Sequence, residues 1–348
     1  MLSRTADNLY WMGRYIERAE NNARILDVAH RMSLLPSLTG EHQTEWQSAI
    51  TISGGEAHFA ENYGKPNETN AVYYMALDRD NPSSIYSCLR AARENCRAIR
   101  HAVPTEVWEA VNTTWFDIRD MTQNRLQSRG AQQFYDWVKE RSSLFRGVTV
   151  GTMLQDDSFH FARLGTFLER GDNTARILDV KFHILLPQGE QVGGSLDYYQ
   201  WTALLRSVSA MRNYRRVFGS EVMPARVAEL LILMEIMPRS LHHCLSEIVT
   251  HLDALGVTYG KRHECHRMAG EAHAKLRFGK VEHIFDMGLH EYLTDFVNRN
   301  ARLGLEIADN FLFTREAAVA QTQSQTQTTG GQSQSQSQSQ SQSLSRTA

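Results

Sequence analysis

The sequence predicts an all-α protein, a helical bundle made of two similar halves of five to six helices. Three observations predict this class. A charged segment recurs about half a chain length later, apolar residues recur at helical spacing in long stretches without proline, and no segment alternates apolar and polar residues long enough to require a strand. The chain has 348 residues, 42% of them hydrophobic, so it can bury a substantial core.

The recurring segment is the strongest sequence feature. "YIERAENNARILDV" at 15–28 returns as "FLERGDNTARILDV" at 167–180, an offset of 152 residues. Further along, "NPSSIYSCL" at 81–89 matches "MPRSLHHCL" at 237–245 at an offset of 156. Offsets that grow slowly along a chain are typical of a tandem duplication with small insertions.

This duplication and a change in composition set the predicted domain organisation. One helical domain spans 1–316, with internal repeats at 1–147 and 148–316. From about residue 317 the chain consists mostly of Gln, Ser and Thr, with almost nothing to bury. We therefore predict a disordered low-complexity tail at 317–348.

The individual helices follow from the same periodicity. Pro82 and Pro238 each stand near an expected helix start, where a missing amide costs nothing. The predicted helices span 2–31, 44–61, 68–79, 82–102, 105–126, 131–145, 152–185, 196–218, 222–236, 238–255, 262–279 and 286–313.

Composition excludes several classes of protein. The 37 basic and 39 acidic residues nearly cancel and are spread along the chain, so we expect no nucleic-acid partner. The longest apolar stretch, 228–237, is too short to span a membrane and contains two glutamates. The four cysteines form no CxxC pair, and no apolar leader begins the chain. We expect a cytoplasmic protein with no membrane association.

The polar side of the repeated helix is unusual. On a helical wheel Leu9, Met12 and Ile16 lie on a broad apolar face. The opposite side has the same residues in both copies, whereas other stretches of the two halves have diverged. These matched positions are Gly13, Glu17, Asn21 and Arg24, with Gly165, Glu169, Asn173 and Arg176.

We infer that the two repeated helices pair about a pseudo-twofold axis through these polar sides. Gly13 and Gly165 each cost a helix roughly 1 kcal/mol relative to alanine, so a glycine in both copies suggests that another backbone passes close by. In such an interface Arg can bind a carboxylate bidentately, and Asn can fill the remaining hydrogen-bond positions.

Two interpretations of the pairing are open. The first is a structural lattice of salt bridges within each helix. Its i,i+4 pairs are Glu20–Arg24 and Asp172–Arg176, and its i,i+3 pairs are Arg24–Asp27 and Arg176–Asp179. The second is a ligand site, in which acids and asparagines hold a hard cation such as Mg²⁺ or arginines hold a phosphate or carboxylate. The candidate binding residues are Glu17, Arg18, Asn21, Arg24, Asp27, Glu169, Arg170, Asn173, Arg176 and Asp179.

Other patterns are weaker. Eight of the fourteen histidines lie between 242 and 290, and His263, His266 and His273 share a helical face, with Cys244 and Cys265 as candidate sulfur ligands. HExxH, ExxH and paired CxxC motifs are all missing, so we expect no metal site and no cofactor. Walker A, GxGxxG and GxSxG motifs are missing too, and no catalytic residue is assigned.

Three segments resemble the bacterial alpha-E domain family: "MLSRTADNLYWMGRYIERAENNARILDV", "NPSSIYSCLRAAREN" and "GTMLQDDSFHFARLGTFLERGDNTARILDV". The resemblance covers about residues 1–315. It implies an all-helical domain of undetermined activity whose genes lie beside those for an ATP-grasp ligase-like protein and a transglutaminase-like cysteine peptidase. The family's signature Glu-Arg and downstream Arg carry over onto Glu17, Arg18 and Arg24, and onto Glu169, Arg170 and Arg176.

The resemblance therefore implies a non-catalytic partner or scaffold in a peptide modification system with those two proteins as partners. One alternative is an enzyme or ligand-binding bundle with its site at the junction of the repeats, where Glu17 or Glu169 serves as base and the arginines hold an anionic substrate. A third interpretation is a metal- or nucleotide-sensing bundle.

Overall fold

The computed structural model describes residues 1–34, 43–124, 126, 130–183 and 194–312, and within these residues every regular element is helical. The prediction of an all-α protein is confirmed. The predicted tail at 317–348 lies outside the described residues. Among the described helices, none is both long enough and apolar enough to cross a membrane.

Two long helices, α1 (Ser3–Ser33) and α9 (Asp157–His183), form the centre of the molecule. The remaining helices are α2 (Gln43–Ser53), α3 (Glu56–Tyr63), α4 (Glu68–Ala76), α5 (Ile85–Ala98), α6 (Thr105–Arg119), α8 (Ala131–Thr152), α10 (Ser195–Ser207), α11 (Met211–Phe218), α12 (Pro224–Ala228), α13 (Leu241–Tyr259), α14 (Glu264–Arg277), α15 (Val281–Met287) and α16 (Leu289–Phe311). A short 3₁₀-helix spans Arg100–Ala102, and a π-helix spans Glu229–Leu233.

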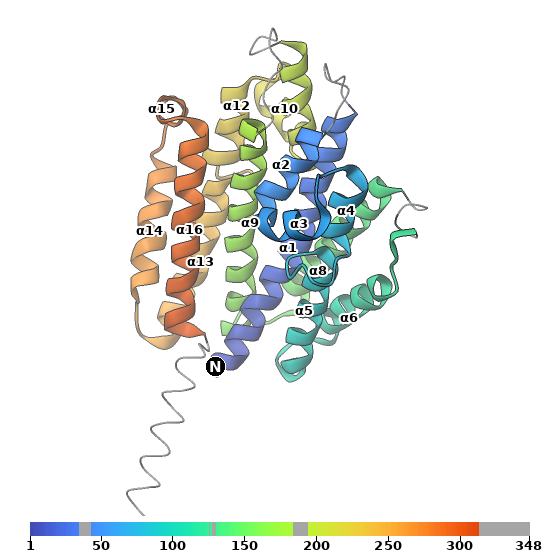
Figure 1. The fold of residues 1–348 in the computed structure, drawn as a ribbon. Helices are drawn as coiled ribbons and strands as arrows, with labels where there is room; N and C mark the ends of the chain where they lie inside the picture. Colours follow the sequence, from blue (N-terminus) through green and yellow to red (C-terminus); the bar gives the residue numbers. More distant parts are fainter. Residues whose placement is uncertain (35–42, 125, 127–129, 184–193, 313–348) are drawn as a thin grey trace, which may run out of the picture.

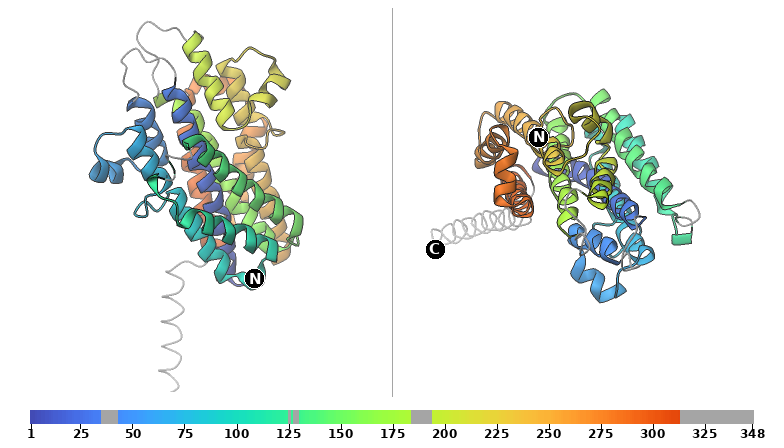
Figure 2. Two further views of the ribbon diagram at one scale, coloured as in Figure 1. Left: turned by 90° about the vertical axis from the view of Figure 1, so that its right-hand side faces the viewer. Right: turned by 90° about the horizontal axis from the view of Figure 1, so that it is seen from above.

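The central helices run side by side in the same direction, and the others surround them (Figures 1 and 2). Helices α5 and α8 pack on α1, and α6 packs on α5 and α8. Helices α13 and α16 pack on α9, and α14 packs on α13 and α16. Helices α2 and α10 each contact both central helices. The polar sides of α1 and α9 are therefore buried among other helices.

Three predicted helices are each interrupted. The predicted 44–61 divides into α2 and α3 at Gly54, where φ is +74°. The predicted 196–218 divides into α10 and α11 at Ser209, where φ is 58°, and Gly288 with φ of 98° precedes α16 and separates it from α15. A left-handed residue cannot continue a right-handed helix, so the single-helix predictions at these places are wrong.

The starts of α5 and α13 share one design. Ser84 accepts a hydrogen bond from the amide of Ser87 at 3.1 Å, and Ser240 accepts one from the amide of His243 at 2.9 Å. Each serine lies two residues after the proline that predicted a nearby helix start. A serine cap of this kind satisfies one of the free amides of the first turn.

Candidate functional site at the crossing of the central helices

Two glycines allow α1 and α9 to touch backbone to backbone. A Cβ atom built on Gly13 would lie 2.3 Å from the carbonyl oxygen of Ala162, and one on Gly165 would lie 2.0 Å from that of Tyr10. Both distances are far below van der Waals contact, so any side chain here would push the helices apart. The predicted close approach is confirmed, and it is reciprocal.

One to two turns further along, each helix supplies a glutamate to an arginine of the other. Arg170 donates from Nε and Nη2 to the two carboxylate oxygens of Glu17, both at 2.9 Å. Arg18 donates in the same way to Glu169, at 2.6 and 3.0 Å. The predicted pairing of the repeated helices through bidentate Arg–Glu bonds is confirmed for these four residues.

The asparagines contribute less than predicted. Asn21 donates from Nδ2 to the backbone carbonyl of Glu169 at 3.3 Å. Asn173 is also buried, but neither its Oδ1 nor its Nδ2 has a hydrogen-bond partner. The expectation that asparagine completes the carboxylate hydrogen bonds is wrong, because Asn21 bonds the backbone and Asn173 bonds neither glutamate.

The next candidate pair, Arg24 and Arg176, again binds reciprocally. Arg24 holds Glu20, as predicted, and donates from Nη1 to the carbonyl of Ser207 at the end of α10. Arg176 holds Asp172 at 2.6 Å and donates to the carbonyl of Ile52 in the last turn of α2 at 3.0 Å. The carbonyls at a helix C-terminus lack helical partners and attract cations.

The last candidate pair, Asp27 and Asp179, faces α8 and α16. Asp27 binds Arg31 at 2.7 Å and Lys139 of α8 at 3.1 Å, so the predicted i,i+3 pair of Arg24 with Asp27 is wrong. Asp179 lies 2.7 Å from Nδ1 of His290 on α16. The ten candidate residues thus form successive layers along the helix pair instead of one pocket.

Sequence comparison missed several arginines of the junction. Arg14 donates to Glu169 at 2.8 Å, while Arg146 and Arg239 approach both Glu17 and Glu20. The repeat could not reveal Arg14 or Arg239, because their equivalents are Thr166 and Ser83. The junction therefore consists of three carboxylates and the guanidinium groups that bind them. The carboxylates are Glu17, Glu20 and Glu169, and the guanidinium groups are those of Arg14, Arg18, Arg24, Arg146, Arg170 and Arg239.

The three carboxylates are held ionised. Burial by itself would raise the pKa of Glu169, but Arg14 and Arg18 outweigh it and lower that pKa to about 2. Burial also opposes ionisation of Glu17 and Glu20, and the surrounding arginines still lower the pKa of both. A general acid or base working near neutral pH needs a carboxyl pKa raised toward 7. These three groups have the opposite shift.

This shift predicts acid sensitivity. A carboxyl whose folded pKa lies below its ordinary 4.5 contributes stability that is complete above about pH 4.5 and is lost as the pH falls toward 2. For Glu169 the contribution is on the order of 3 kcal/mol, at 1.36 kcal/mol per pKa unit. Urea denaturation between pH 7 and pH 3 measures it. Glu169→Gln should have a flatter pH profile than the wild type, and identical profiles would contradict the assignment.

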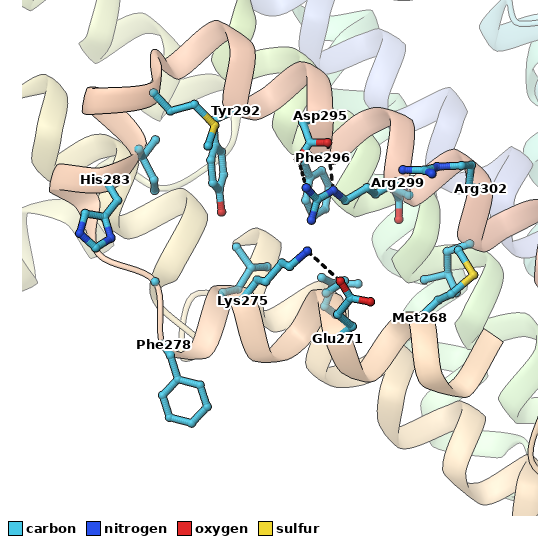
Figure 3. Close-up of a pocket in the computed structure, with 18 of the residues that line it drawn as sticks. Met268, Glu271, Lys275, Phe278, His283, Tyr292, Asp295, Phe296, Arg299 and Arg302 are labelled. Carbon is cyan, nitrogen blue, oxygen red and sulfur yellow. Dashed lines mark hydrogen bonds and ion pairs between the residues drawn. The ribbon is translucent and has the colours of Figure 1, made fainter. Parts of the chain in front are cut away.

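A cavity of about 940 Å³ lies between α14 and α16, with α15 at one end (Figure 3). Leu276, Phe296 and Leu303 supply apolar surface. Two ion pairs line it: Lys275 binds Glu271 at 2.8 Å, and Arg299 binds Asp295 at 2.6 Å. Lys280 and Arg302 also line it and have no ion pair among the described residues. No sequence motif marks this cavity, because its residues come from several helices and the ion pairs within it have ordinary i,i+4 spacing.

Among the described residues, the candidates His263, His266, His273, Cys244 and Cys265 do not come together as one group of metal ligands. His266 is buried and bonds the backbone of His263 and Leu252, both at 2.9 Å. Burial raises the pKa of each of the two thiols to about 12, which disfavours the thiolate that binds metals. His266 therefore serves the packing of α14 against α13, and the two cysteines are buried in the core.

Comparison with known proteins gives one match. The model of the Alpha-E family, described as a predicted alpha-helical domain with a conserved ER motif, matches residues 1–312. No curated protein and no solved structure matches the chain.

Proposed function

The chain belongs to the Alpha-E family, and we propose that it acts as a non-catalytic helical scaffold for a bacterial ATP-grasp ligase-like and a transglutaminase-like protein. The observation that carries this proposal is the state of the Glu-Arg residues. Each glutamate of the crossing is bound by at least two guanidinium groups, and its pKa is lowered. Residues engaged in this way hold helices together and have no free group for acid–base chemistry.

We also infer that the two halves arose by duplication. The packing order around α1, through α5, α6 and α8, has a counterpart around α9 through α13, α14 and α16. The reciprocal contacts support the same inference, since Arg24 to Ser207 and Arg176 to Ile52 join equivalent positions of the two halves. A duplicated bundle with a rigid central junction suits a protein that holds two partners in a fixed arrangement.

The cavity between α14 and α16 is the surface that we propose for one partner. Its apolar floor and its mixture of positive and negative side chains suit a protein segment better than a polyanion, because the carboxylates of Glu271 and Asp295 line the same cavity. Phe278, at the end of this cavity, is 76% exposed and offers an apolar anchor.

Affinity purification from the native cytoplasm tests the proposal. We expect an ATP-grasp-like or a transglutaminase-like protein to co-purify at native expression. Phe278→Ser should reduce recovery of that protein without changing the melting temperature, because the exposed ring of Phe278 contributes little to the core. Val257→Ser is the matched control: Val257 is 82% exposed on α13, outside the cavity. If neither the ATP-grasp-like nor the transglutaminase-like protein co-purified, the result would contradict the scaffold function.

A second candidate function is an enzyme or ligand-binding bundle that uses the Glu/Arg/Asn junction. The excess of guanidinium groups over carboxylates in the described junction favours it, because an anion would balance the charge. Burial and the neighbouring Arg24 lower the pKa of Arg239 to about 10. The protonated form of Arg239 is therefore disfavoured by the surrounding positive charge. Glu17→Gln distinguishes this candidate from the scaffold, because a ligand site would lose binding or activity without loss of stability.

A further inference from the structure

A separate cluster of metal-ligating residues lies where the π-helix meets α13 and α14. One donor atom from each of Glu235, His242 and His273 lies within 4.8 Å of the others. Glu235 follows the π-helix, His242 is in the first turn of α13, and His273 is on α14. Nothing in the sequence pattern joins these three, because 31 residues separate the histidines.

His242 is oriented as a ligand. Its side chain is buried, and Nδ1 lies 2.8 Å from the carbonyl oxygen of Leu233. A carbonyl accepts only, so Nδ1 carries the proton, and Nε2 is left with a free lone pair. That Nε2 is buried and has no hydrogen-bond partner. A backbone carbonyl on the second ring nitrogen is the arrangement that fixes most metal-binding histidines.

His273 completes a pair of imidazoles. Its Nε2 is also buried without a hydrogen-bond partner, and its ring lies 5.1 Å from that of His242, centroid to centroid. Buried polar atoms without partners are costly, and two in one place suggest a shared ligand. A cation bound to both nitrogens would remove the cost.

The segment around Glu235 is fixed from two sides. Ser246 donates to Oε1 of Glu235 at 2.8 Å, and Nδ1 of His243 lies 3.0 Å from its backbone carbonyl. The preceding π-helix, Glu229–Leu233, supplies the carbonyl that orients His242. Single π-helical turns occur frequently at functional sites.

We propose that Glu235, His242 and His273 bind a divalent transition metal ion, with Zn²⁺ the best fit to two imidazoles and one carboxylate. Tetrahedral zinc with bonds of 2.0–2.1 Å places its ligand atoms about 3.4 Å apart. The backbone of Glu235 is held by His243, whereas its carboxylate is exposed and can exchange its bond from Ser246 for the ion to close this distance. Three protein ligands leave the fourth position open to water or to a group from another molecule. This site is independent of the proposed scaffold function.

Calorimetric titration of the EDTA-treated full chain with ZnCl₂ tests the proposal. We expect one ion per chain, and His273→Ala and Glu235→Ala should each weaken binding by at least about tenfold. His283→Ala is the control, because His283 is an exposed histidine on α15 outside the cluster. The two variants avoid the deeply buried His242, so loss of folding does not confuse the result.

A second measurement uses Co²⁺ as the probe. The wild type should give the intense visible absorption of tetrahedral Co²⁺, which Zn²⁺ displaces, and His273→Ala should not. Absence of binding to the wild type would overturn the proposal. Equal binding by the wild type, His273→Ala and Glu235→Ala would also overturn it, because the ion would then sit on other histidines.

Discussion

Gly165→Ala is expected to lower the free energy of unfolding by about 3 kcal/mol or more, the upper end of the usual cost of overpacking. The new Cβ would lie 2.0 Å from the carbonyl oxygen of Tyr10, and a backbone atom inside a helix cannot move aside alone. The two central helices would have to separate, and separation lengthens the Arg170–Glu17 and Arg18–Glu169 bonds one to two turns away. Gly13→Ala should act in the same direction.

Gly147→Ala and Gly270→Ala are the matched controls. Both glycines lie inside helices, and a Cβ on either would have no atom within 4 Å. Alanine has a higher helix propensity than glycine, so the free energy of unfolding of these two variants should rise by up to about 1 kcal/mol. Urea denaturation at pH 7 compares all four. A Gly165→Ala protein as stable as the two controls would show that the helices do not cross at these glycines.

The crossing could be predicted because the sequence contains it twice. A solvent-facing polar side changes freely, so recurrence of Gly, Glu and Arg at equivalent positions indicated a constraint, and bidentate pairing followed from the chemistry of Arg and Glu. The layers at Arg24 and Arg176 were predicted only in part. Their acids were identified from i,i+4 spacing, but the carbonyls of Ser207 and Ile52 belong to helix ends that the sequence does not place in space.

Arginines without an identical counterpart in the other half could not be predicted. Arg146 reaches Glu17 from α8, and Arg239 reaches it from the turn before α13. Arg146 stands in no recognisable motif, and Arg239 lies in the matched segment 237–245 but has Ser83 as its counterpart. The interruption of the predicted 196–218 helix was equally hidden. Ser209 adopts a left-handed conformation that its residue type does not favour, so the fold and not the local sequence imposes it.

These unrepeated arginines make the two halves of the junction unequal. Glu17 is 1% exposed and is bound by Arg170, Arg146 and Arg239. Glu169 is bound by Arg14 and Arg18, whose side chains are 18% and 25% exposed. If either glutamate is neutralised, the arginines around Glu169 can turn toward water. Arg170 and Arg239, each 8% exposed, cannot.

Glu17→Gln is therefore expected to cost about 5 kcal/mol, the upper end of the range for removing one partner of a buried ion pair. Glu169→Gln, at an equivalent position of the repeat, should cost about 3 kcal/mol. Glutamine has nearly the same shape as glutamate, so the difference reports the charge and not a cavity. Urea denaturation of both variants at pH 7 measures this difference. Equal losses in the free energy of unfolding would contradict the unequal burial of the two glutamates and their arginines.

Glu17→Gln also separates the two candidate functions. If the junction is structural, every effect of Glu17→Gln on partner recovery should follow its loss of stability, and Arg239→Met, which removes part of the excess positive charge, should partly restore both. If the junction is an enzyme or ligand site, Glu17→Gln should melt like the wild type and lose activity or ligand binding alone. Because Glu17 has three arginine partners, a charge-reversed pair with Arg170 would leave the new arginine facing Arg146 and Arg239, so neutral variants give the sharper comparison.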